Sequence, residues 1–156
     1  MKDQITTYLS MLAPDDISSL EKLEGAAGLN FWGEQQYRRF LSELPEYFGC
    51  KITAIGDQGS HYTAGFFLAR AVCETMEILK IAVLPELQNR GIGTELMKAA
   101  YAEGIRRGCE RCLLEVRKSN ENAIRFYNGQ RFRMAGCRQD YYTNPVEDAW
   151  VMERDL

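Results

Sequence analysis

The chain has 156 residues, of which 46% are hydrophobic and 26% are charged, and its formal net charge is −3 at pH 7. This length suits one domain with a sizeable core and is short for two, so we expect a single domain over residues 1–156. The slightly acidic composition argues against direct binding of nucleic acid, because proteins that bind it usually present a strongly basic surface.

The sequence contains no apolar run that approaches the roughly 20 residues of a membrane span. Its first ten residues, MKDQITTYLS, also lack the apolar core of a secretion signal. The five cysteines are an odd number and cannot all pair within one chain. These features predict a reduced, cytoplasmic protein that does not enter a membrane.

Two of the cysteines, Cys109 and Cys112, form a CxxC motif of the kind also found in zinc sites. A structural zinc site usually needs four nitrogen or sulfur ligands, and the only histidine, His61, is distant in the sequence. We therefore expect both thiols to be buried as small apolar groups, and we predict no metal site.

Two helices are predicted before residue 45. Residues 14–28 begin with Pro14 and Asp15, which suit a helix start, and end at Gly28. Residues 33–44 form the second predicted helix. In both segments apolar residues recur at helical spacing: Ile17, Leu20 and Leu23 in the first, and Tyr37, Phe40, Leu41 and Leu44 in the second.

Three strands are predicted next, over residues 50–57, 61–73 and 76–83. These segments are rich in β-branched and aromatic residues and are separated by short turn-like sequences. Because strands joined by short connections pair side by side in opposite directions, we expect this part of the sheet to be antiparallel.

Helices and strands alternate in the remainder of the chain. A helix is predicted from residue 92 to about residue 108, and the next helix is expected to have Ser119 as its N-cap. The helix that starts at residue 92 has Ile92, Leu96, Ala100 and Tyr101 on one face. It is followed by a strand over 111–118, a helix over 119–128, and closing strands over 131–142 and 147–156. This order predicts a mixed α/β (α+β) fold with helices flanking a sheet.

The segment QNRGIG, residues 88–93, lies where a predicted strand gives way to a helix. The unpaired N–H groups at a helix N-terminus favour an anion, glycine lets a phosphate approach the backbone, and Arg90 can add charged hydrogen bonds. The segment lacks the Lys-Ser or Lys-Thr of a Walker motif, and Leu96 replaces the third glycine of a dinucleotide motif. A helix start that uses glycine for tight packing is the alternative.

QNRGIG resembles the Q/R-x-x-G-x-G/A signature of the GNAT superfamily of acetyl-CoA-dependent N-acetyltransferases. Residues 114–127, LEVRKSNENAIRFY, are similar to the L-E-V-R-x-S-N-x-x-A-I-x-L-Y segment of its RimI type, the ribosomal-protein-alanine N-acetyltransferases. Three further motifs match in order between about residues 15 and 152: Phe31-Trp32-Gly33 resembles P-W-S, Arg138 with Tyr141-Tyr142 resembles R-x-x-Y-Y, and Glu147-Asp148-Ala149 matches E-D-A.

The resemblance implies a GNAT-type fold, in which acetyl-CoA lies in a V-shaped gap between two splayed parallel strands. Here these strands are residues 76–83 and 111–118. It also implies a set of contacts to the co-substrate: main-chain groups of Ile81, Ala82 and Val83 on the pantetheine arm and thioester, a pyrophosphate loop of Asn89, Arg90, Gly91, Ile92, Gly93 and Thr94, and a hydrogen bond from Asn120. Asn120 could equally be a capping residue of the next helix. The Val83 N–H would stabilise the oxyanion of the tetrahedral intermediate.

Acyl transfer to an amine requires that the ammonium lose a proton, that the nitrogen attack the thioester and that the leaving thiolate gain a proton. The position of Glu115 in LEVR makes it the candidate base, and Tyr127 is the candidate acid. From the residues alone, a glutamate on an alternating strand is often a solvated surface residue. Ile124 and Tyr127 are also spaced like the core face of a helix.

The acceptor amine is expected to enter the site from a different side than acetyl-CoA. Tyr141, Tyr142 and Trp32 are predicted to line this entrance, although the two tyrosines could instead form a cross-strand aromatic pair. An α-amine, with a pKa near 7.8, is roughly a tenth neutral at pH 7, whereas an unperturbed lysine is neutral in fewer than about one molecule in a thousand. One modest base is therefore compatible with a protein N-terminus, and alanine is the residue that the RimI resemblance implies.

Departures from the family pattern fall on the acceptor side. Arg131 stands where the family often has a glycine before its phenylalanine, the segment 143–146 is slightly short, and the sequence around Trp32 lacks the proline and serine. A small amine, such as a polyamine or an aminoglycoside, is therefore an alternative acceptor. A non-catalytic acetyl-CoA-binding module is a third interpretation.

Overall fold

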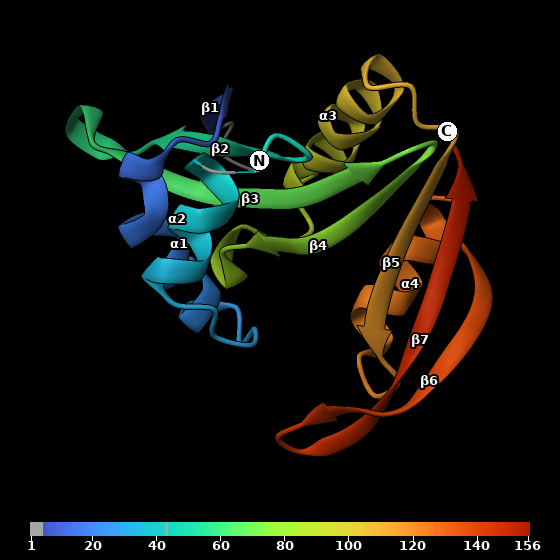
Figure 1. Cartoon of the computed structure of the whole chain (residues 1–156). Coiled ribbons are helices and arrows are strands. Elements are labelled where there is room, and N and C mark those ends of the chain that lie inside the picture. The colour runs from blue at the N-terminus through green and yellow to red at the C-terminus, as the bar shows by residue number, and fades with distance from the viewer. Residues whose placement is uncertain (1–4, 43) are drawn as a thin grey trace.

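A seven-stranded mixed sheet with helices on both faces forms the body of the protein (Figure 1). The computed structural model describes residues 5–42 and 44–156. The sheet order is β1-β2-β3-β4-β5-β7-β6. The strands are β1 (Thr6–Met11), β2 (Tyr47–Ile55), β3 (His61–Val72), β4 (Thr75–Val83), β5 (Arg111–Arg117), β6 (Arg133–Thr143) and β7 (Val146–Asp155), and the α-helices are α1 (Ile17–Ala26), α2 (Glu34–Ser42), α3 (Ile92–Arg106) and α4 (Glu121–Gly129).

The strand pairing agrees with the predicted fold class. Strands β2, β3 and β4 form an antiparallel meander, and β6 and β7 form an antiparallel pair beside β5. Strands β4 and β5 are parallel but pair only through Thr75–Ile78 and Arg111–Leu114. Beyond these residues the two strands diverge, as Figure 1 shows. The predicted pair of splayed parallel strands is therefore confirmed.

Alternation of side chains along the strands divides the core between the two faces of the sheet. Phe67 belongs to the larger cluster beneath α3 and α4, together with Leu96 and Leu114. Its neighbour Phe66 belongs to the smaller cluster beneath α1 and α2, together with Leu20. The sheet therefore separates two clusters, with α3 and α4 on one face and α1 and α2 on the other.

The first two helices match their predicted ranges with small differences. Ile17, Leu20 and Leu23 are buried, and Gly28 has φ 67° just beyond the end of α1. Tyr37 is fully buried in α2. Of the residues predicted for this helix, Glu43 lies outside the described residues.

The first strand and the start of α4 differ from the sequence prediction. Strand β1 was not predicted, yet it pairs antiparallel with β2 along the edge of the sheet. The prediction that Ser119 is the N-cap of α4 is wrong. The N-cap is Asn120, whose side chain accepts a hydrogen bond from Ala123 N at 3.1 Å. Asn120 thus has the acceptor geometry of an N-cap.

Arg131 occupies the backbone conformation that glycine usually provides. It has φ 66° after the end of α4, and its N–H donates to Asn128 O at 3.0 Å. The turn before Phe132 therefore keeps a left-handed residue although the family glycine is absent. The substitution changes the side chain at this position and not the type of turn.

The two cysteines of the CxxC motif are buried, as expected from the packing interpretation. Cys109 is 5% exposed and Cys112 is fully buried in the larger cluster. Burial raises the pKa of the Cys112 thiol to about 12, which keeps it protonated and unreactive at neutral pH. Among the residues that the structure describes, no three His, Cys, Asp or Glu side chains form a metal-binding group.

Acid should weaken the ion pairs at the C-terminal end of α3. Glu103 accepts hydrogen bonds from Arg106 and Arg107 at 2.6–2.8 Å, and these lower the pKa of Glu103 to about 2. A carboxyl group whose pKa is lower in the folded than in the unfolded protein stabilises the fold at pH values above its unfolded pKa. This stabilisation is lost as the pH falls towards the folded pKa of about 2. Because Arg106 is mostly exposed, we expect a contribution of only about 1 kcal/mol.

This contribution can be measured by urea unfolding of the wild type and Glu103→Gln at pH 6, 4 and 3. The difference in unfolding free energy between the two proteins should be largest at pH 6 and should shrink towards pH 3. A constant difference over this range would show that Glu103 titrates normally in the folded protein.

Candidate active site

The divergence of β4 and β5 leaves main-chain groups of β4 without a partner strand. Leu84 N donates to Ala64 O of β3, and successive residues of a strand direct their polar groups to opposite edges. The groups of Ile81 and Val83 therefore point towards β5, and those of Ala82 point towards β3. Gln88 Nε2 donates to Val83 O at 3.3 Å on this edge. Of the three β4 residues predicted to contact the co-substrate, Ile81 and Val83 thus have main-chain groups on the open edge, whereas Ala82 faces β3 and is buried in the smaller cluster.

The strand-to-helix junction after β4 is open to solvent. Asn89, Arg90 and Gly91 are exposed, and Gly91 begins α3 with φ 88° and has no side-chain cap. The first main-chain hydrogen bond into the helix is Glu95 N to Gly91 O. The N–H groups of the first turn, including those of Ile92 and Gly93, precede this bond and remain for a ligand. An anion could approach them without displacing other parts of the protein.

The two glycines of this junction have different structural roles. A Cβ atom on Gly91 would meet nothing within 4 Å, so the glycine is required there by its φ value and leaves open space. A Cβ atom on Gly93 would lie 3.2 Å from the ring of Phe126. The packing interpretation therefore accounts for Gly93, where α3 approaches α4, whereas no packing contact accounts for Gly91. Thr94 Oγ1, also in the predicted loop, accepts from Gln130 at 3.4 Å.

Glu115 lies on the face of β5 that is opposite the larger core cluster. Leu114 and Val116 are buried in that cluster, so the alternating Glu115 and Arg117 face the side of α1 and α2. Glu115 Oε1 forms an ion pair with Arg138 Nε at 2.5 Å. The Glu115 side chain is 13% exposed and that of Arg138 is 59% exposed, so the arginine can leave without rearrangement of the core.

Both tyrosines of the predicted entrance contact this group of charges. A hydrogen bond to Glu115 raises the pKa of Tyr141 to about 12. The Tyr142 ring lies 4.0 Å from the guanidinium carbon of Arg117. The two rings are 5.1 Å apart in a T-shaped arrangement, after a turn of strand β6 in which Asp140 has φ 49°. A bulge in the strand, and not cross-strand pairing, thus brings the adjacent tyrosines together.

Tyr127 is buried on the opposite side of the sheet from Glu115. It is 8% exposed and packs edge-on against Phe132 with ring centroids 5.7 Å apart. Burial raises the pKa of the Tyr127 phenol, and proximity to Tyr142 raises it further. Tyr142 is in turn close enough for Glu115 to raise its pKa. The candidate acid and the candidate base therefore lie on opposite sides of the sheet, and Tyr142 is near enough to both to take part in these pKa shifts.

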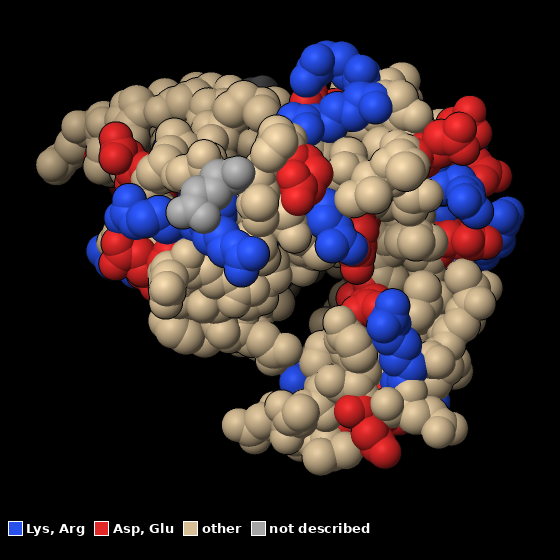
Figure 2. All heavy atoms as spheres, in the orientation of Figure 1, with Lys and Arg blue, Asp and Glu red and all other residues tan. Residues whose placement is uncertain are grey.

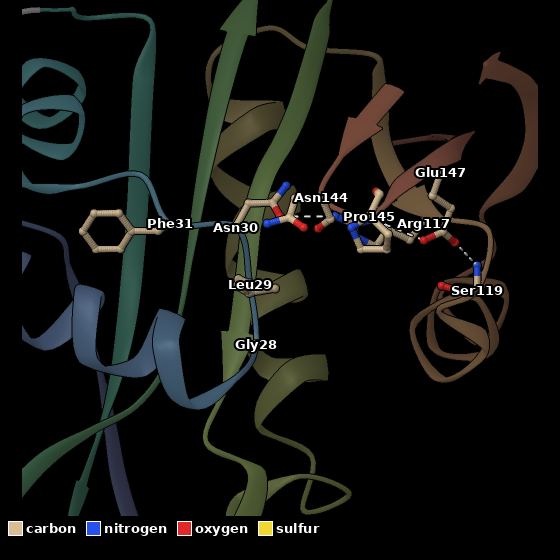
Figure 3. Close-up of a pocket in the computed structure, with 9 residues that line it drawn as sticks. All are labelled: Gly28, Leu29, Asn30, Phe31, Arg117, Ser119, Asn144, Pro145 and Glu147. Carbon is tan, nitrogen blue, oxygen red and sulfur yellow. Dashed lines mark hydrogen bonds and ion pairs between the residues drawn. The ribbon is translucent and has the colours of Figure 1, made fainter. Parts of the chain in front are cut away.

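A polar pocket lies beside this group (Figure 3). It has a volume of about 500 Å³ and is formed by the loop between α1 and α2, the end of β5 and the turn between β6 and β7. The lining residues are Gly28, Leu29, Asn30, Phe31, Arg117, Ser119, Asn144, Pro145 and Glu147. Figure 3 shows Asn30 and the β6–β7 turn approaching each other from opposite sides of the pocket.

Arg117 joins the two sides of the pocket. Its guanidinium donates to Asn30 Oδ1 at 3.4 Å, to Asn144 O and Pro145 O at 3.3 Å, and to Glu147 Oε2 at 3.1 Å. Glu147 Oε1 also accepts from Ser119 N at 2.6 Å, at the start of the α4 turn. The pocket is therefore bounded by a network that connects the α1–α2 loop to the β6–β7 turn.

Sequence reasoning placed Trp32 at the entrance and assigned no role to Arg117 or Asn30. Trp32 instead packs its ring against Phe40 and over the Lys80 ammonium, while Asn30 and the exposed Phe31 line the pocket. A signal for Arg117 was present, because it lies two residues after Glu115 and hence on the same face of the strand. No comparable signal marks Asn30, which lies in a loop.

The surface view supports an opening next to these residues. Figure 2 shows a hollow between the part of the molecule that carries α1 and α2 and the part that carries the β6–β7 hairpin. Basic and acidic side chains are interspersed on the face shown, without a strongly basic stripe. Among the described residues, no helix is both long and apolar enough to cross a membrane.

Comparisons with known proteins agree with this geometry. Residues 17–132 match the model of the acetyltransferase (GNAT) family. The [ribosomal protein bS18]-alanine N-acetyltransferase of Salmonella typhimurium is 31% identical over 146 residues, which cover 92% of this chain and 94% of that protein.

Solved structures show the same architecture. The crystal structure of the ribosomal-protein-S18-alanine N-acetyltransferase from Escherichia coli superposes with a TM-score of 0.83 at 27% identity, covering 97% of this chain and 94% of that one. Arabidopsis thaliana NAA60 in complex with acetyl-CoA also gives 0.83, covering 97% and 99%, although at 18% identity this likeness concerns the fold alone. The family match and the close relative, together with the splayed strands and the open helix start, show that this chain belongs to the GNAT family of acetyltransferases, as its motifs predicted.

Proposed function

We propose that the protein transfers the acetyl group of acetyl-CoA to the N-terminal α-amine of a protein, with a ribosomal protein that begins with alanine as the preferred acceptor. The observation that carries this proposal is the similarity along 92% of the chain to an enzyme named for that reaction. The pocket between the α1–α2 loop and the β6–β7 turn supports it, since the pocket residue Arg117 lies two residues after Glu115 on the same face of β5.

The residues of the junction and of β4 suit acetyl-CoA. The open N–H groups at the start of α3 and the Arg90 side chain would hold the pyrophosphate, and the outward-facing groups of Ile81 and Val83 would hold the pantetheine arm. When bound, acetyl-CoA supplies an activated thioester carbonyl. Asn120 Oδ1 is engaged in capping α4, so its amide nitrogen is the part that would remain for the co-substrate.

Two side chains are proposed to handle protons in this reaction. Glu115 would accept a proton from the acceptor ammonium, directly or through water, after Arg138 moves aside. Tyr127 would donate a proton towards the leaving sulfur, since its raised pKa keeps the phenol protonated at neutral pH. The Val83 N–H would stabilise the oxyanion.

Peptide acetylation followed by mass spectrometry tests this function. The purified protein, acetyl-CoA and a peptide beginning with alanine should give a product heavier by one acetyl group, located on the N-terminal residue by fragmentation. The same peptide with a blocked N-terminus and an internal lysine should not react. Polyamines and aminoglycosides serve as competing acceptors, and faster CoA release with one of them would overturn the assignment to a protein N-terminus.

A further inference from the structure

A buried charged pair lies beneath the loop that lines the acceptor side of the pocket. Lys80 Nζ and Glu24 Oε2 are 2.8 Å apart, and their side chains are only 5% and 0% exposed. Removing two charges from water is costly unless further hydrogen bonds satisfy them. None of the steps proposed above uses this pair, so its place in the structure requires a separate explanation.

Glu24 Oε2 also accepts a hydrogen bond from the Tyr37 hydroxyl of α2. Other hydrogen bonds of the two residues hold the loop between α1 and α2, residues 27–33. Trp32 N donates to Glu24 Oε1 at 2.6 Å, and Leu29 N donates to Glu24 O at 3.0 Å. Lys80 Nζ donates to Asn30 O at 2.5 Å and lies 4.5 Å from the centre of the Trp32 ring. The loop is therefore attached at two points to charges that are buried beneath it.

These attachments connect the loop to strand β4. Lys80 immediately precedes Ile81, which directs its main-chain groups towards the gap where the thioester is expected. Asn30, held through its carbonyl by Lys80, also accepts from Arg117 at the pocket. One strand thus contacts the acetyl-CoA side through its backbone and the acceptor side through the Lys80 side chain.

We propose that Lys80 is a positioning residue for the acceptor, which fixes the α1–α2 loop relative to β4 by its hydrogen bond to the Asn30 carbonyl. This inference rests on the proposed function, because it assigns the loop to the acceptor side. Misplacement of a binding loop by about 1 Å can reduce turnover strongly even when the reacting groups are intact. Loss of the bond should therefore weaken acceptor binding while acetyl-CoA binding is kept.

Three variants separate positioning from stability. Lys80→Met alone leaves the Glu24 carboxylate buried without its cation and is expected to unfold readily, so it is not the informative protein. Glu24→Gln leaves Lys80 buried without its carboxylate, and because burial already lowers the pKa of Lys80 to about 8, the side chain is expected to become a neutral amine that still donates to Asn30 O. Glu24→Gln combined with Lys80→Met keeps an unbranched side chain of similar length. In comparison with Glu24→Gln it lacks the Lys80 nitrogen, which donates to Asn30 O and lies over the Trp32 ring.

The test compares Glu24→Gln with the double variant. Four quantities are measured for each: the KM for the alanine peptide, the KM for acetyl-CoA, the Tm, and the amide hydrogen exchange rates of residues 27–33. The double variant should show a peptide KM about tenfold higher than Glu24→Gln and faster exchange in the loop, with an unchanged KM for acetyl-CoA. Equal peptide KM values in the two variants would overturn the inference. If the wild type acetylates no peptide, the proposed function fails, and equal exchange rates in the loop would then overturn the positioning role separately.

Discussion

Replacing Glu115 with glutamine is expected to lower kcat by about 10²–10⁴-fold, the range that general-base catalysis contributes in enzymes. Glutamine has nearly the same shape but cannot accept the proton of the acceptor ammonium at neutral pH. Since the side chain is 13% exposed and lies outside the larger core cluster, the substitution should leave the fold unchanged. Steady-state CoA release at saturating acetyl-CoA and alanine peptide measures the effect.

Two matched variants separate loss of the base from loss of an ion pair. Arg138→Met removes the same 2.5 Å pair but leaves the Glu115 carboxylate, so kcat should remain within about tenfold of the wild type. Glu153→Gln removes the carboxylate of another pair between strands, that with Arg133 at 3.2 Å, and should have no effect on turnover. If Glu115→Gln behaves like Glu153→Gln, Glu115 is not the base.

Much of the fold could be predicted because periodic apolar residues and turn signals occur in the same segments. The meander β2–β4 was recognisable from short β-rich runs with short connections, and α3 from Ile92, Leu96 and Ala100 on one face. Strand β1 escaped prediction because it lies at the edge of the sheet, where Tyr8, Leu9 and Met11 stay exposed and no regular alternation is imposed. Edge strands are specified mainly by pairing with a neighbour, which a local pattern does not contain.

The candidate site also has one part that the sequence predicts well and one that it does not. Its co-substrate side consists of contiguous backbone in β4 and at the start of α3, so a short motif could locate it. Its acceptor side is assembled from three separate segments, which meet at Arg117 through contacts to Asn30, Asn144 and Glu147. The pair of Glu24 with Lys80 joins residues 56 positions apart in the sequence, and neither residue has a local pattern that suggests burial.

Substituting valine for Gly91 is expected to weaken acetyl-CoA binding by about 100-fold, because a branched side chain would fill the open space in front of the first N–H groups of α3. From the sequence alone the fold should be largely unaffected. The structure changes this expectation, since φ 88° is strained for a β-branched residue and should also cost on the order of 1–3 kcal/mol in stability. A loss of affinity must therefore be distinguished from a loss of folded protein.

Gly108→Val provides the matched comparison. Gly108 has φ 83°, a Cβ atom there would also meet nothing within 4 Å, and it follows the opposite end of the same helix. Both variants should lower Tm by similar amounts because the backbone strain is alike, but calorimetry should find weakened acetyl-CoA binding only in Gly91→Val. Equal affinities in the two variants would mean that the start of α3 does not hold the pyrophosphate. The GNAT motif would then serve only to join the strand to the helix.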